Sequence, residues 1–245
     1  MFNLDIDNDY FFSYIFPKLE SLPTPIDEND NPIVHKKIIV FGDQGSGKSI
    51  LFRSLVAKAV ELYGEENVNA VISHRGDSLL NLLSWGYDNK PVQIQIADDF
   101  TLDNTPEWVL KQYFRSRHIW RAQYKVTHGY ILSIFSVHRF MSMSKEIRSG
   151  ANAVLVKSMS LNPYDNNVIK RYIGDVGVED LRIIEELSDN NPHLKSFTPY
   201  YVRTGRRAIL CLPPSKENFI TNIVDKRKRL SNDMALKLKK IAVYT

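Results

Sequence analysis

The chain has 245 residues, of which 43% are hydrophobic and 24% are charged, and its formal net charge at pH 7 is +4. This length and apolar content are sufficient for one substantial core, because the buried fraction of a chain rises with its size. No apolar run approaches the ~20 residues that cross a bilayer, and no basic and then apolar leader opens the sequence, which argues against a membrane-spanning or secreted protein. The single cysteine, Cys211, excludes an internal disulfide and is typical of a reducing compartment.

The two ends of the chain differ in charge. Residues 1–34 carry seven acidic side chains against one basic side chain, together with aromatic residues and prolines, and they predict a short helix followed by an extended segment. Residues 216–245 carry eight basic side chains against three acidic ones. This basic end indicates a polyanionic partner, and the alternative is a solvated helix face.

Strand and helix patterns alternate between these two ends. An apolar strand at about 36–41 is followed by a helix over 48–63. A later helix is expected from Thr105, a typical capping residue, to about Lys125. A short helix is expected at 77–85 and further strands at 69–73, 92–97, 130–135 and 152–156. Strands separated by helices predict a mainly parallel sheet covered on both faces, which is an α/β fold.

Beyond Met159 the pattern changes. A helix with several tyrosines, a hairpin with strands at 200–203 and 207–212, and a basic helical end are expected there. The sequence therefore predicts three parts, which are an N-terminal arm (1–34), a core of alternating strands and helices (35–160) and a C-terminal extension (161–245).

A phosphate loop follows the first core strand. The residues from Gly42 to Ser49 read G-x-x-x-x-G-K-S between an apolar strand and a helix. Glycines allow backbone N–H groups to turn inward around phosphate oxygens, and the positive end of the helix faces the same anion. We expect ATP and Mg²⁺ to bind here, with Lys48 at the β- and γ-phosphates and the Ser49 hydroxyl on the metal. The expected nucleotide-binding residues are Gly42, Asp43, Gln44, Gly45, Ser46, Gly47, Lys48, Ser49 and Ile50.

A second carboxylate is expected at the end of a neighbouring strand, where it holds the hydration shell of Mg²⁺. The strand at 92–97 is followed by Asp98 and Asp99. Asp98 is the predicted metal residue, and Asp99 is placed to orient or activate the attacking water. Asp99 is a shorter substitute for the glutamate that is more usual there, and the alternative is that the two acids only begin a loop.

The strand at 130–135 ends in Ser136-Val137-His138-Arg139. Ligands of open α/β sheets bind at the carboxyl ends of the strands. If this strand lies between the loop strand and the acidic strand, His138 can contact the γ-phosphate or the lytic water. A structural role for His138 is the alternative.

The segments 129–139 (GYILSIFSVHR) and 146–158 (EIRSGANAVLVKS) carry a family resemblance. They resemble the sensor region of the FtsK–HerA superfamily, in which a strand ends in Thr-Gln-Arg and an Ile-(Arg/Lys)-x-Asn-type segment leads to the next strand. The resemblance spans about 36–160 and is strongest to the viral DNA-packaging ATPases of the poxvirus and archaeal-virus type. His138 stands where the family usually has Gln.

The resemblance implies a RecA-like P-loop NTPase core with a small C-terminal hairpin and helix extension. It also implies an ATP hydrolase that assembles into a homo-oligomeric ring (pentamer or hexamer) and moves along double-stranded DNA, most simply to package a viral genome. A capsid or membrane protein at the packaging vertex is then an expected partner. The expected location is the cytoplasm, that of the host for a viral protein, with association with the capsid or virion.

Such rings complete each site with an arginine from the neighbouring subunit, which stabilises charge on the transferred phosphoryl group. Arg121 is the first candidate and Arg148 the second, because each is expected near the edge of the core. Arg117 and Arg139 are further candidates, and a solvated surface arginine is the alternative for each.

Contacts to the DNA backbone need only scattered basic residues and no sequence-reading motif. The candidates are Lys111, Arg115, the run 226–229, Lys237, Lys239, Lys240 and the turn 203–207, which is otherwise a plain hairpin turn. Three other functions stay open at this point. They are a plasmid or conjugative DNA translocase, a small-molecule phosphotransferase, and a nucleotide-gated assembly protein with little turnover whose acidic arm docks a partner.

Overall fold

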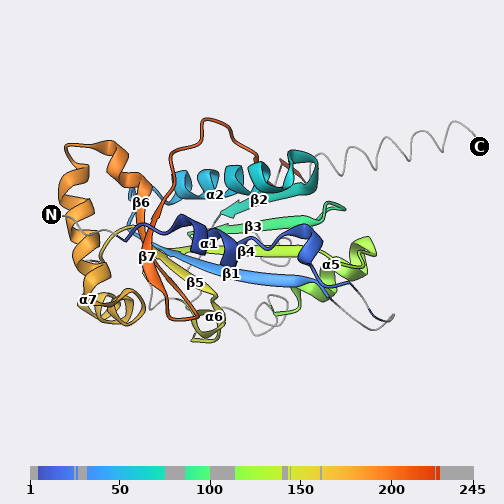
Figure 1. Cartoon of the computed structure of the whole chain (residues 1–245), viewed down its shortest axis with the longest axis horizontal. Helices are drawn as coiled ribbons and strands as arrows, with labels where there is room; N and C mark the ends of the chain where they lie inside the picture. Colours follow the sequence, from blue (N-terminus) through green and yellow to red (C-terminus); the bar gives the residue numbers. More distant parts are fainter. Residues whose placement is uncertain are drawn as a thin grey trace, which may run out of the picture.

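The computed structural model of the chain describes residues 5–24, 26, 32–74, 86–99, 114–139, 143, 145–160, 162–223 and 225–226. The helix expected at 77–85 and the part of the long helix before residue 114 lie outside these ranges. Within them, a single sheet is covered by helices on both faces (Figure 1). In this described part of the chain, no helix combines the length and the apolar character that a bilayer-spanning segment needs.

Parallel strands form the centre of the sheet. They are β1 (Val34–Phe41), β2 (Val68–His74), β3 (Val92–Asp98), β4 (Tyr130–Val137) and β5 (Ala153–Val156). Each of them matches an expected strand, and their order is β5-β1-β4-β3-β2. Since β4 pairs in parallel with both β1 and β3, it lies between the loop strand and the acidic strand. The predicted α/β fold with a RecA-like P-loop core is therefore confirmed.

The sheet extends beyond the strands of the expected core. The expected hairpin is present as β6 (Phe197–Val202) and β7 (Arg207–Cys211), and β6 pairs antiparallel with β5. At the opposite edge, β8 (Ile220–Asn222) pairs parallel with β2. The segment after residue 160 thus adds strands to both edges of one sheet. The boundaries of the three expected parts remain predictions.

One face of the sheet is covered by α1 (Asn8–Ile15) and α2 (Lys48–Tyr63). Both helices share one apolar cluster with every second residue of the central strands, such as Val40 and Ile94. Short 3₁₀ turns lie at Leu19–Ser21, Glu65–Asn67 and Pro192–Ser196. The helix α2 ends at Gly64, whose φ of 84° is a backbone conformation that favours glycine.

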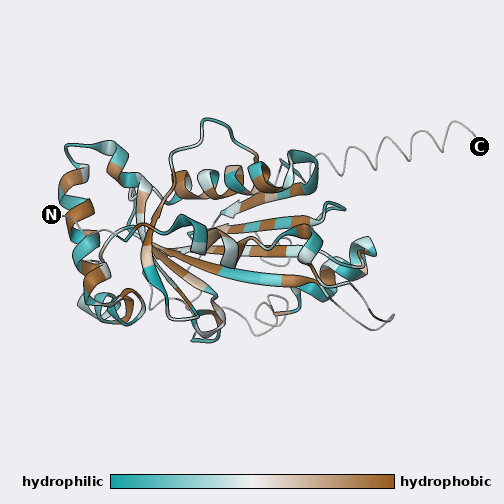
Figure 2. Cartoon of the chain, viewed as in Figure 1, coloured by the Kyte–Doolittle hydropathy of each residue, from teal (hydrophilic) through white to brown (hydrophobic). Residues whose placement is uncertain are grey.

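The other face is covered by α5 (Ser116–Tyr124), α6 (Lys145–Gly150) and α7 (Pro163–Ser188). Here α6 and α7 pack on the alternate residues of the strands, among them Phe41 and Val154, and Trp120 of α5 packs on Ile131. The helix α7 contains a kink at Gly174, where φ is 75° and ψ is 178°. Figure 2 shows the resulting pattern, with largely hydrophobic strands inside and helices that alternate between polar and apolar surfaces.

The acidic N-terminal segment packs on the sheet from residue 5 onward. Asp7 N–H donates to the carbonyl of Ile209, and the Asn8 side chain exchanges two 2.8 Å hydrogen bonds with the backbone of Cys211. The buried ring of Phe11 meets Tyr200 edge-on at 5.0 Å between centroids. Full burial of one such side chain contributes about 2 kcal/mol. The helix α1 is therefore part of the core.

Candidate nucleotide-binding site

The phosphate loop (residues 42–49) connects β1 to α2, as expected. Gly45 has φ 80° and Gly47 has φ 91°, which are left-handed conformations that favour glycine. A Cβ on Gly42 would lie 2.5 Å from Ser46 Oγ and 2.8 Å from Lys157 Cβ, so no larger residue fits without a shift. These conformations bring the loop back over the first turn of α2, whose terminal N–H groups have no partner within the helix.

Lys48 begins α2 and its side chain returns to the start of the loop. Its Nζ donates to the carbonyl of Gly42 at 2.8 Å and to the carbonyl of Asp43 at 3.0 Å. Only 6% of Lys48 is exposed. Burial lowers the pKa of this ammonium group, and the nearby carboxylates of Asp99, Asp98 and Asp43 oppose that shift. Lys48 is thus a cation held at the centre of the loop.

Asp98 ends β3 at the same edge of the sheet and is 7% exposed. Its Oδ2 lies 3.6 Å from Nδ1 of His74, the last residue of β2. Its Oδ1 is buried without a hydrogen bond. An unpaired buried polar atom costs about 1–3 kcal/mol, more for a charged group, so this oxygen is suited to a cation or its bound water.

Asp99 and His138 meet in front of the loop. His138 Nε2 lies 2.7 Å from Asp99 Oδ1, and its Nδ1 lies 3.2 Å from both the Gly42 carbonyl and Lys48 Nζ. Asp99 has φ 57°, a left-handed conformation that costs a non-glycine residue about 1 kcal/mol or more. That conformation turns the chain at the end of β3, and the carboxylate lies 4.0 Å from Lys48 Nζ. The structure therefore brings Lys48, Asp99 and His138 into one cluster.

The donor set suits magnesium. Mg²⁺ is usually held by one or two carboxylates, a hydroxyl, waters and substrate phosphates, and not by a cage of protein ligands alone. The described residues contain no group of three or more His, Cys, Asp or Glu side chains that could hold a metal ion. The unpaired Oδ1 of Asp98 and the exposed hydroxyl of Ser49 are the protein atoms that would hold it.

Two residues after β5 support the loop, and the sequence analysis gave them no role. Ser158 Oγ accepts the Asp43 N–H at 2.7 Å, and Lys157 N–H donates to the Phe41 carbonyl at 2.7 Å. Lys157 Nζ donates to Thr198 Oγ1 at 3.0 Å and to the carbonyl of Lys195. Burial, together with the positive charge of Lys195, lowers the pKa of Lys157 to about 8. Their position directly after an apolar strand is the sequence signal that could have identified them as site residues, as it did for Asp98.

Comparisons with known proteins give matches at the level of structure only. No family model and no curated protein matches the chain. B204, the DNA-packaging ATPase of Sulfolobus turreted icosahedral virus, is 13% identical with a TM-score of 0.48 over 74% of this chain and 98% of that chain. The pCW3 conjugation coupling protein TcpA is 11% identical with a TM-score of 0.39 over 73% and 60%, respectively. EssC (ATPases 2 and 3) from Geobacillus thermodenitrificans is 13% identical with a TM-score of 0.43 over 84% and 44%.

At 11–13% identity, these likenesses concern the fold alone. Open α/β sheets bind ligands at the carboxyl ends of their strands. The phosphate loop, Asp98, Asp99 and His138 all lie at this end of the P-loop core.

The candidate arginines lie at different places in the P-loop core. Arg117 and Arg121 are on α5, and Arg117 borders a hollow with Val34 and His35 at the amino end of β1, away from the phosphate loop. Arg148 is on α6, which leads into the amino end of β5. Arg139 directly follows His138 at the edge that carries the loop, and it is exposed. Within one subunit, the described contacts do not bring Arg121 or Arg148 to the loop, and their action from a neighbouring subunit stays a prediction.

Several residues expected to contact DNA have structural partners. Lys226 Nζ donates to Asn69 Oδ1 at 2.8 Å and lies 3.7 Å from Asp88 Oδ2, so it attaches the chain to the β2 edge. In the hairpin turn, Arg206 pairs with Asp7 and Arg207 donates to the Tyr172 carbonyl. Arg115 is exposed next to α5. The other candidates, Lys111, 227–229, Lys237, Lys239 and Lys240, lie outside the described residues.

Proposed function

We propose that this protein is a magnesium-dependent ATPase that moves double-stranded DNA, with packaging of a viral genome as its specific task. The observation that carries the ATPase assignment is the meeting of three strand ends. Lys48 comes from the loop after β1, Asp98 ends β3 and Asp99 follows it, and His138 follows β4, with 2.7 Å between Asp99 Oδ1 and His138 Nε2.

In this proposal the loop binds the triphosphate through its backbone N–H groups and Lys48. Lys48 Nζ exchanges its carbonyl partners, Gly42 and Asp43, for oxygens of the β- and γ-phosphates. Ser49 and Asp98 would hold a magnesium ion, which, when bound, would neutralise charge on the phosphate oxygens.

Hydrolysis then needs a positioned water. The second oxygen of the Asp99 carboxylate, Oδ2, accepts a proton from the water whose oxygen attacks the γ-phosphorus, while the bond from that phosphorus to the β,γ-bridging oxygen breaks and ADP and phosphate form. His138 holds the Asp99 carboxylate on one side and contacts the loop on the other. A bound γ-phosphate changes the surroundings of His138 Nδ1, and this is the basis of its proposed sensor role.

Two features support DNA as the partner. The segments 129–139 and 146–158 resemble the sensor region of DNA-translocating FtsK–HerA ATPases, and the chain carries a net positive charge. The ring, the arginine from a neighbouring subunit (Arg121 or Arg148) and a capsid or membrane partner are part of the same proposal. Plasmid or conjugative transfer is an alternative task for the same motor.

The test is the rate of ATP hydrolysis with and without linear duplex DNA, with Lys48→Ala as the inactive control. We expect DNA to raise the rate several-fold, and higher salt to remove the increase because counterion release weakens phosphate contacts. A rate indifferent to DNA would exclude the motor. Transfer of labelled phosphate to an added acceptor would identify a phosphotransferase, and ATP-dependent assembly without turnover would identify an assembly protein.

A further inference from the structure

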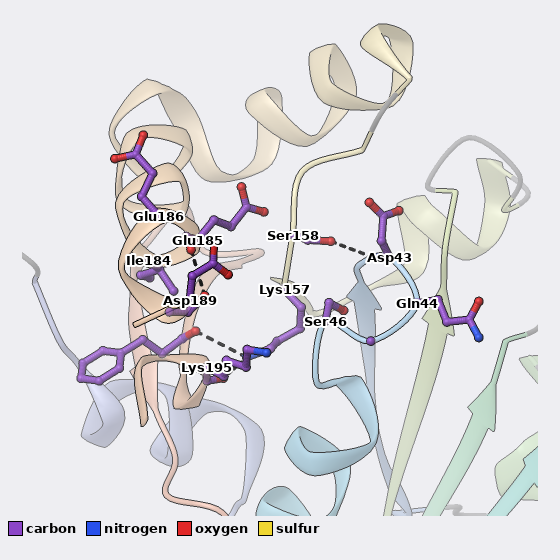
Figure 3. A pocket seen from close by; sticks show the side chains of 13 residues that line it. Asp43, Gln44, Ser46, Lys157, Ser158, Ile184, Glu185, Glu186, Asp189 and Lys195 are labelled. Atoms are coloured by element: carbon purple, nitrogen blue, oxygen red, sulfur yellow. Dashed lines mark hydrogen bonds between the residues drawn. The ribbon is translucent and has the colours of Figure 1, made fainter. Parts of the chain in front are cut away.

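A hollow of about 500 Å³ lies beside the phosphate loop (Figure 3). Its lining includes the loop residues 43–46, the end of β5 at Lys157 and Ser158, and the end of α7. In the sheet, β1 separates β5 from β4 and β3. The hollow and the Asp98–Asp99–His138 cluster therefore lie on opposite flanks of the loop.

This placement orients a bound nucleotide, if the proposed function is right. The γ-phosphate has to face Asp98, Asp99 and His138, because the attacking water lies there. The nucleoside end of the bound nucleotide then has to extend from the loop on the side opposite this cluster. The hollow adjoins the loop on that side. Its volume is in the range of small-ligand sites, about 300–1,000 Å³.

The wall of the hollow contributed by the end of α7 carries carboxylates beside Ile184 and Ser188, and Lys157 and Lys195 lie elsewhere in the lining. Glu185, Glu186 and Asp189 line it at the end of this helix, and the last turn of α7 contains no basic residue. Carboxylates are unfavourable there, because the helix dipole gives the C-terminus a partial negative charge. An ionised carboxylate only accepts hydrogen bonds. This wall therefore repels phosphate and favours a ligand group that donates.

Two of the three carboxylates are directed at the hollow. In Figure 3, Glu185 and Asp189 point toward the space beside the loop, whereas Glu186 extends away from it. Glu185 Oε1 accepts the Met159 N–H at 2.8 Å, which fixes this side chain and leaves its second oxygen available. The Asp189 carboxylate has no hydrogen bond or ion pair with the described residues. Ile184 and Phe197 add apolar lining.

We propose that this hollow holds the nucleoside of the bound triphosphate and that Asp189, supported by Glu185, selects bases with an exocyclic amino group. Adenine presents N–H donors at the position where hypoxanthine presents a carbonyl oxygen. A carboxylate accepts a hydrogen bond from the amino group and repels the carbonyl oxygen. ATP is therefore preferred to inosine triphosphate.

The test is calorimetric titration of the full-length protein with ATP, inosine triphosphate and inorganic tripolyphosphate, each with Mg²⁺. In the wild type we expect ATP to bind about fivefold more tightly than inosine triphosphate, the effect of one partly solvated hydrogen bond to a charged group. Asp189→Asn should bring this ratio close to one and leave tripolyphosphate affinity the same or higher. Asp175→Asn, at an exposed aspartate of α7 outside the hollow, should keep the wild-type ratio.

The outcomes separate this inference from the proposed function. Equal affinity of the wild type for ATP and inosine triphosphate, or an unchanged ratio in Asp189→Asn, would overturn the selection by Asp189 while the phosphate loop still binds nucleotide. Failure of all three ligands to bind would overturn both the inference and the ATPase proposal.

Discussion

Asp99 Oδ1 lies 2.7 Å from His138 Nε2, and the two residues come from the ends of adjacent strands. This contact joins the carboxylate proposed to act on water to the residue proposed to sense the γ-phosphate. It also places His138 Nδ1 3.2 Å from Lys48 Nζ in the phosphate loop. The geometry makes these three side chains one unit, and the effects of changing them should not be additive.

His138→Ala should lower kcat for ATP hydrolysis by about 10²-fold with a smaller change in KM, because the contact acts mainly on the positioned water and Asp99. His138→Gln keeps a hydrogen-bond donor near Asp99 and should retain more activity than His138→Ala. Steady-state kinetics of both variants test this. His193→Gln, an exposed histidine in the 3₁₀ turn at Pro192–Ser196, is the control and should match the wild type. Equal kcat in His138→Ala and the wild type would contradict the role of His138.

Asp98→Asn should separate function from stability. The buried Oδ1 of Asp98 has no hydrogen bond and the amide has the same size, while the loss of charge removes an attraction to Lys48. The free energy of unfolding of the nucleotide-free protein should therefore change by no more than about 1 kcal/mol. The same change should raise the Mg²⁺ concentration needed for half-maximal hydrolysis and reduce kcat strongly. Chemical denaturation and a magnesium titration measure the two effects. Asp175→Asn, at an exposed aspartate on α7, should change neither. A large loss of stability in Asp98→Asn would show that this carboxylate is structural.

Lys157 should make stability depend on pH. Its pKa is lowered to about 8 in the folded protein, chiefly by burial, whereas a lysine in the unfolded chain titrates near 10.4. Between these values the unfolded state binds more protons, so the wild type should gain stability relative to Lys157→Met as pH rises from 8 toward 10.4. Thermal unfolding of both proteins at several pH values measures the difference. Lys216→Met, at an exposed lysine, is the control, and its stability should change with pH as that of the wild type does. If the stability of Lys157→Met also changed with pH as that of the wild type does, the lowered pKa of Lys157 would be refuted.

Much of this architecture could be predicted because its signals are local. The central strands are continuous apolar runs, as buried parallel strands require, and the phosphate loop is a short pattern in which Gly45 and Gly47 adopt left-handed conformations. Asp98 and Asp99 could be found because they directly follow such a strand. Their roles, and that of His138, remain predictions. The structure shows that the side chains of Asp99 and His138 lie close together at this edge of the sheet.

The features that the sequence did not predict depend on long-range pairing. The sheet continues through β6, β7 and β8, although nothing local indicates which edge each strand joins. The contacts of Lys157 and Ser158 with the loop depend on the pairing of β5 with β1, which brings Ser158 to Asp43. Lys226 looked like part of a basic tail, yet its Nζ lies among the oxygens of Asn69, Gly86 and Asp88.

The affinity of the native protein for Mg·ATP, compared with that of Lys48→Ala by calorimetry, tests the central claim most directly. Among the described residues, the contacts of Lys48 Nζ are with the loop carbonyls, His138 and Asp99, all within the site, so the variant should stay folded. Lys58→Ala on the same helix is the matched control. We expect saturable binding in the wild type and in Lys58→Ala, and a loss of affinity of at least about tenfold in Lys48→Ala with the circular dichroism spectrum unchanged. Absence of binding in the wild type, or equal affinity in folded Lys48→Ala, would contradict the account.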